Sequence, residues 1–181
     1  MKKLYRILCI TLLIAILLSA CGNTVTPEAS ISLEEYKIMV SDFNSRIMEE
    51  SVILANAGMS EYNYWKAYSS LPMYGELDYQ KMAEAAMEWL SENSDADAET
   101  VKAAYDELIV ASINISDANI DGEIPEELPE LVQALFGAYH ALYSLVVEPS
   151  GEIGDFLIQL NNHVNAIMAF NEDISALIEE A

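Results

Sequence analysis

Residues 153–180 read IGDFLIQLNNHVNAIMAFNEDISALIEE, and the apolar pattern of this stretch decides the fold class. Apolar residues and one asparagine recur in it at alternating intervals of four and three. These positions are Ile153, Leu157, Leu160, Val164, Ile167, Asn171, Ile174 and Ile178. The spacing is typical of a helix that buries one seam against neighbouring helices, and a polar residue within such a seam favours one helix register. We therefore expect a helix over residues 152–179, with Asn171 fixing its register.

The clearest helix start in the chain is Ser32. Glu35 follows three residues later, which is the spacing of a capping box, where each residue bonds a backbone N–H of the other. An apolar face then continues at helical spacing as far as Leu54. Gly58 either ends this first helix or only interrupts it, and in the second case residues 60–68 continue it.

Three further helical segments lie between these two. Leu71-Pro72 and Gly75 break the chain, because Pro and Gly are poorly tolerated in helix interiors. Helical spacing then resumes over about 78–92, 98–115 and 126–147, and no stretch shows the alternation of a β-strand. The predicted fold is all-α, an antiparallel four-helix bundle with an extra short helix or interruption around residues 71–92.

The first 21 residues have the layout of a secretory signal peptide. A basic head (Lys2, Lys3, Arg6) precedes an uncharged run that ends at Leu18. This run is too short to span a bilayer comfortably, since a spanning helix needs roughly 20 apolar residues. We expect the segment to direct export, and an uncleaved anchor is the alternative.

Leu18-Ser19-Ala20-Cys21 resembles the lipobox of bacterial lipoproteins. The resemblance implies diacylglycerol on Cys21, cleavage before it, and attachment to the outer face of the cytoplasmic membrane. Residues 1–20 would then be the signal peptide, 21–30 the lipidated cysteine and its tether, and 31–181 the helical bundle domain. An ordinary signal peptide with a chance cysteine stays open. The segment LYSLVVEPSG (142–151) also resembles small uncharacterised helical lipoproteins of Gram-positive bacteria, which implies no activity.

The chain is strongly acidic, with 30 Asp and Glu against 8 Lys and Arg and a formal net charge of −22. A nucleic-acid partner is excluded on this ground, because such binding depends on Lys and Arg that neutralise phosphates. A cationic peptide or a basic protein surface fits better. The alternative is that the charge only keeps the protein soluble. A hydrophobic content of 52% argues against a disordered acidic tail.

Residues 117–128, DANIDGEIPEEL, contain the one suggestion of a metal site. Its early positions resemble the EF-hand and dockerin-type calcium loops, whose ligands lie at positions 1, 3, 5 and 7 with Gly at 6. The matching residues are Asp117, Asn119, Asp121, Gly122 and Glu123. The closing acid at position 12 is replaced by Leu128, so Glu127 would serve only if the loop closed differently. The alternative is an acidic connector in which Pro125 begins a helix and the following glutamates favour its positive end.

An aromatic cluster is the second candidate binding site. It consists of Tyr62, Tyr64, Trp65, Tyr68 and Tyr74. Exposed aromatic side chains on an irregular segment bind sugars or protein partners, although the same residues could instead close one end of the bundle. His140 and His163 have neither the di-iron spacing nor an HExxH motif, and no nucleophile or phosphate-binding motif occurs. We therefore expect a non-enzymatic, membrane-anchored binding module for a protein, peptide or envelope component. A calcium-dependent module is the alternative, and the oligomeric state stays unpredicted.

Overall fold

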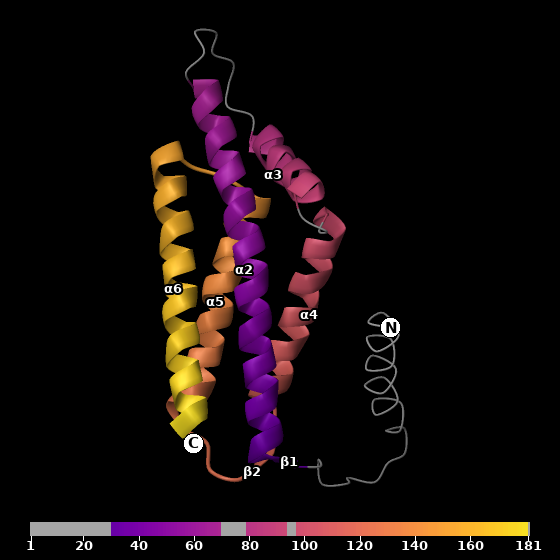
Figure 1. The fold of residues 1–181 in the computed structure, drawn as a ribbon, viewed down its shortest axis with the longest axis vertical. Helices are drawn as coiled ribbons and strands as arrows, with labels where there is room; N and C mark the ends of the chain where they lie inside the picture. The colour runs from indigo at the N-terminus through magenta and orange to yellow at the C-terminus, as the bar shows by residue number, and fades with distance from the viewer. Residues whose placement is uncertain (1–29, 70–78, 94–96, 181) are drawn as a thin grey trace.

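The computed structural model describes residues 30–69, 79–93 and 97–180, and the predicted signal peptide, Cys21 and tether lie outside this part (Figure 1). These ranges hold five helices and one pair of two-residue strands. The helices are α2 (Leu33–Ser69), α3 (Tyr79–Asn93), α4 (Ala98–Ser116), α5 (Glu127–Val147) and α6 (Ile153–Glu180), and the strands are β1 (Ile31–Ser32) and β2 (Ile120–Asp121). The prediction of an all-α bundle is confirmed.

The long helices α2, α4, α5 and α6 lie side by side and alternate in direction (Figure 1). The short helix α3 lies obliquely beside the upper part of α2, above α4, so α3 and α4 together accompany the 37-residue α2. Helix α2 contacts all four other helices and is the central element of the bundle. The strands, the start of α5 and the end of α6 lie at one end of the molecule (Figure 1).

The capping box at the start of α2 forms as expected. The Ser32 backbone N–H donates to Glu35 Oε2 at 2.9 Å, and the Glu35 backbone N–H donates to Ser32 Oγ at 3.3 Å. These hydrogen bonds to the backbone and side chain of Ser32 lower the pKa of Glu35. Gly58 does not end this helix, which continues to Ser69.

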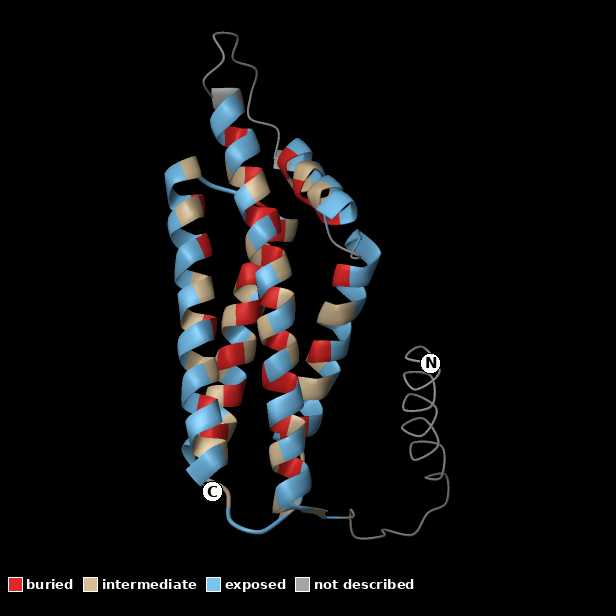
Figure 2. Ribbon diagram, viewed as in Figure 1, coloured by how far each residue is buried: buried red, intermediate tan, exposed pale blue. Residues whose placement is uncertain are grey.

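The core follows the inner faces of the helices from Tyr36 to Ile174 (Figure 2). In α6 the seam is displaced slightly from the predicted one, because Phe156 is fully buried whereas Leu157 is only half-buried. A straight helix has 3.6 residues per turn, so a strict 3.5-residue repeat drifts around it. Asn171 was predicted to fix the register; its backbone carbonyl, which any residue would supply, accepts a hydrogen bond of 3.4 Å from Nδ2 of the buried Asn44 in α2.

A parallel pairing of β1 with β2 was not predicted. Ile31 is opposite Ile120 and Ser32 is opposite Asp121, and the Ile31 N–H donates to the Asn119 carbonyl at 2.8 Å. Two residues are too few to show any alternation in the sequence. The pairing fastens the connector between α4 and α5 to the start of α2.

Helix α5 is the one helix of the described part that is long and apolar enough to cross a membrane. In the bundle it contacts every other helix and buries residues along its length, including Leu128, Leu135 and Val146. Its apolar 18-residue window is 33% buried in the bundle, so packing accounts for part of its apolar composition.

Candidate functional site: a groove between α5 and α6

The 117–127 segment connects α4 to α5 by way of β2. Asp117 caps the end of α4, and its N–H donates to the Ile113 carbonyl at 2.9 Å. Asp121 belongs to β2, and Gly122 has a φ of +147°, a conformation that favours glycine. Helix α5 begins at Glu127, two residues after Pro125, whose carbonyl accepts from Leu128 N–H at 3.1 Å.

The predicted calcium ligands in this connector do not gather around one point. Asp117, Asn119, Asp121, Glu123 and Glu127 are all exposed. Within the described residues, no three His, Cys, Asp or Glu side chains are placed to share a metal ion. The calcium hypothesis therefore gains no support from the fold of the loop.

Calcium is accordingly expected to leave the stability of residues 22–181 unchanged. A ligand that binds the folded state with useful affinity raises the melting temperature, whereas scattered exposed carboxylates bind calcium too weakly to do so. The measurement compares thermal unfolding in millimolar calcium and in chelator at equal ionic strength. A clearly higher melting temperature in calcium would favour the calcium-dependent alternative.

The aromatic cluster is only partly a surface feature. Trp65 is 4% exposed and packs edge-on against Phe156, with ring centroids 6.1 Å apart, so it belongs to the core and not to an exposed aromatic surface. It is buried because it continues the apolar face of α2. Tyr62 is half-buried beneath Lys66, and Tyr64 is exposed. The side chain of Tyr68 and the whole of Tyr74 lie outside the described residues.

The histidines take part in packing between helices. His140 is exposed on α5, and its Nδ1 lies 2.6 Å from the Tyr105 hydroxyl of α4. The Tyr105 ring also stacks on Tyr143, with centroids 4.0 Å apart. His163 is half-buried in α6, and burial lowers its pKa.

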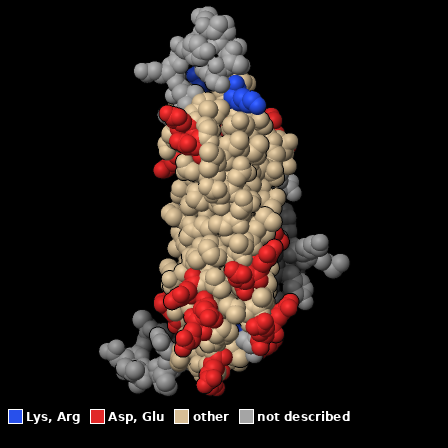
Figure 3. Space-filling model, turned by 90° about the vertical axis from the view of Figure 1, so that its left-hand side faces the viewer, with Lys and Arg blue, Asp and Glu red and all other residues tan. Residues whose placement is uncertain are grey.

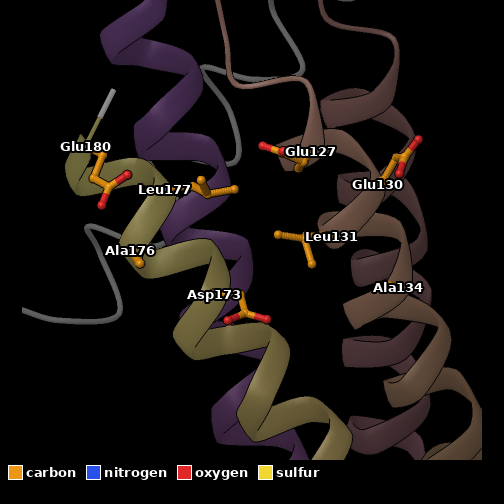
Figure 4. Close-up of a pocket in the computed structure, with 8 residues that line it drawn as sticks. All are labelled: Glu127, Glu130, Leu131, Ala134, Asp173, Ala176, Leu177 and Glu180. Carbon is orange, nitrogen blue, oxygen red and sulfur yellow. The ribbon is translucent and has the colours of Figure 1, made fainter.

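A groove of about 740 Å³ lies between the first turns of α5 and the last turns of α6. Its floor is apolar and its rim is acidic. The floor residues are Leu131, Ala134, Ala176 and Leu177, and the rim residues are Glu127, Glu130, Asp173 and Glu180. Figure 4 shows Leu131 and Leu177 extending toward each other across the groove. The volume is in the range of ligand-binding sites in proteins.

The groove exists because the seam between α5 and α6 opens at this end. Leu131 and Leu177 pack against the core but stay half-exposed, and Ala134 and Ala176 are too small to fill the space between the helices. Leu128, one turn before Leu131, is fully buried and does not line the groove. The open seam leaves apolar surface in contact with water.

The four rim carboxylates have no side-chain partner in the part of the chain that the structure describes. Across residues 30–67, 80–93 and 97–180, no ion pair or hydrogen bond joins any of them to another side chain. Glu127 and Glu130 lie in the first turn of α5, where the helix dipole favours acids. Glu180 lies in the last turn of α6, where the dipole favours cations and no basic residue is present, whereas Asp173 lies about two turns earlier, beyond the reach of this effect. Glu180 therefore opposes local helix stability.

Charged residues are unevenly distributed along α5 and α6. Residues 131–147 and 156–171 contain no Asp, Glu, Lys or Arg. Figure 3 shows the resulting uncharged middle, with acids gathered most densely at the lower end, where the groove lies.

Sequence reasoning missed most of the groove and one buried acid. Glu127 was predicted to bind metal, but nothing in the sequence indicated that α6 would bring Asp173 and Glu180 to the same groove. Glu61 in α2 is fully buried, and within the described residues neither of its carboxylate oxygens has a hydrogen-bond partner. Its place seven residues after the buried Leu54 was a usable signal, since that spacing returns to the same helix face.

No family model, curated protein or solved structure shows significant similarity to the chain. The function proposed below therefore rests on the residues and their geometry.

Proposed function

We propose that this protein is a non-enzymatic, lipid-anchored module on the outer face of the cytoplasmic membrane, and that it binds a segment of another polypeptide in the groove between α5 and α6. The observation that carries the binding proposal is the groove itself: an apolar floor open to water within a rim of carboxylates that have no partner among the described residues. Binding would bury this apolar surface, and the burial of apolar surface is the main favourable contribution to the free energy of association.

The lipid anchor is supported by the sequence Leu18-Ser19-Ala20-Cys21. The described chain enters the bundle at β1, at the same end as the groove (Figure 1). A tether of nine residues after Cys21 reaches at most about 30 Å. The groove would thus face the membrane-proximal space, where segments of membrane-associated proteins are concentrated.

Replacing Cys21 with alanine is expected to release the protein from the membrane fraction or to leave an unprocessed precursor, because two acyl chains on that thiol supply stable anchoring. Fractionation of cells that express the full chain, followed by detection of the lipid by metabolic labelling, measures this. Cys9→Ala is the matched control, since Cys9 lies within the leader and should not affect anchoring. If wild type and Cys21→Ala fractionate alike and neither carries lipid, the anchor is wrong.

The binding half of the proposal is tested separately, by cross-linking from Ala176 in living cells. Release from the membrane alone would not remove the groove, and failure of the anchor would leave the binding proposal standing.

A further inference from the structure

The ligand of the groove can be specified by its chemistry, on the premise that the groove is the binding site. We infer that it takes a cationic amphipathic helical segment of another polypeptide, with apolar side chains facing the floor and Lys or Arg along both flanks. The inference rests on the composition of the floor, the charge and spacing of the rim, and the dimensions of the groove.

The floor selects for apolar side chains. Leu131 and Leu177 present branched side chains toward each other, with Ala134 and Ala176 beside them (Figure 4). The alanines allow a helix to approach closely, and a row of Leu or Ile at helical spacing would complete the seam that α5 and α6 leave open. An amphipathic helix bound in a hydrophobic groove is a recurring mode of peptide recognition.

The rim selects for positive charge that is spread along the ligand. Asp173 and Glu180 are seven residues apart on α6, so they are about 10 Å apart along the helix axis. In the part of the chain that the structure describes, no three acidic side chains gather tightly enough for one metal ion. Several Lys or Arg side chains on a helix match this spacing, whereas a single cation does not.

Charge also argues against other occupants. A second copy of this chain carries the same net charge of −22 and an identical acidic rim, so the two rims would repel each other. An anionic lipid headgroup is repelled for the same reason. A cationic segment, in contrast, relieves the repulsion among the four rim carboxylates and the unfavourable position of Glu180 in the last turn of α6.

The test uses residues 22–181, which contain the complete described core from Tyr36 to Ile174. The probe is a synthetic 15-residue peptide with Leu at helical spacing on one face and Lys on both flanks. Two control peptides replace every Lys by Glu, or keep the composition but distribute the Leu residues evenly around the helix. Fluorescence anisotropy measures affinity at low salt and at half-molar salt. The amphipathic cationic peptide is expected to bind, and both controls to bind much more weakly.

Variants of the protein test whether the peptide binds in the groove. A rim variant carries Glu127→Gln, Glu130→Gln, Asp173→Asn and Glu180→Gln, and is expected to bind about tenfold more weakly with a reduced salt dependence, because each exposed ion pair contributes modestly. The matched control loses the same charge at exposed sites outside the groove, through Glu34→Gln, Glu49→Gln, Glu88→Gln and Glu92→Gln. It is expected to bind nearly as wild type does.

Two outcomes would overturn the inference: no binding of the amphipathic cationic peptide, or equal weakening by the rim variant and its control, which would reveal only general attraction to an acidic protein. A partner that cross-links from Ala176 in cells while the peptide does not bind would leave the groove as the binding site. That combination would overturn the ligand class alone.

Discussion

Replacing Glu61 with methionine is expected to raise the free energy of unfolding at pH 7 by about 3 kcal/mol. Glu61 is fully buried in α2 without a hydrogen-bond partner among the described residues, and this burial raises its pKa to about 9. At pH 7 the folded protein therefore holds Glu61 protonated, while the unfolded chain ionises it. Each pH unit between the pKa of Glu61 in the unfolded chain and pH 7 costs about 1.4 kcal/mol of folding stability.

The same pKa shift predicts how stability depends on pH. The folded-state pKa lies above the unfolded value of 4.5, so the contribution of the protonated group is fully present below about pH 4.5 and is lost as the pH rises toward 9. Wild type should therefore lose stability across this window, partly through Glu61 and partly through general charge repulsion. The difference between wild type and Glu61→Met isolates the contribution of Glu61.

Urea unfolding at several pH values measures both effects. Glu61→Gln should also flatten the pH dependence but gain less stability, since its amide still lacks partners. Glu49→Met, at an exposed position of the same helix, should change stability by less than about 0.5 kcal/mol. If Glu61→Met and wild type show parallel pH profiles, then Glu61 is charged in the folded protein and the interpretation fails.

Replacing Gly58 with leucine is expected to lower the free energy of unfolding by about 3 kcal/mol. A Cβ atom at this position would lie 2.7 Å from Leu160 Cδ1 of α6 and 3.2 Å from Val146 Cγ2 of α5. Glycine thus allows α2 to approach both helices closely, and a larger side chain would force them apart. Gly58→Ala should be close to neutral, because the flexible end of Leu160 can move and alanine gains about 1 kcal/mol of helix propensity.

Gly137 provides the matched control for Gly58. It lies within α5 and is exposed, and a Cβ there would meet no atom within 4 Å. Gly137→Ala should therefore stabilise the protein by about 0.5–1 kcal/mol. Thermal and urea unfolding of the variants separate the two sites. Equal stability of Gly58→Leu and wild type would show that the three helices are not closely packed at Gly58.

The helices could be predicted from the sequence because their ends carry local signals. Ser32 with Glu35 begins α2, and Pro125 with the following glutamates precedes α5. Gly58 was ambiguous for a physical reason: glycine weakens an isolated helix, but in the bundle the absence of a side chain is what permits close packing. Tertiary contacts therefore decided a point that local propensity left open.

The candidate site could not be predicted as a whole, because it forms from residues about 40 positions apart. Leu131 and Leu177 face each other across the groove only through the register of α5 against α6, and this register is set by packing along both helices. The 117–127 segment shows the converse difficulty. Asp, Asn and Gly at its spacing suit both a calcium loop and a tight connector, and the pairing of β2 with β1 that shapes the segment is a long-range contact that these residues do not predict.

Site-specific photo-cross-linking in cells that natively make the protein tests the binding proposal most directly. A photoreactive amino acid at Ala176, on the groove floor, is compared with one at Val52, which is exposed on α2 outside the groove. We predict a discrete cross-linked polypeptide from Ala176 that is absent from Val52 and diminished when the four rim acids are neutralised. No adduct from Ala176, or the same adducts from both positions, would contradict the proposal that the groove between α5 and α6 is the binding site.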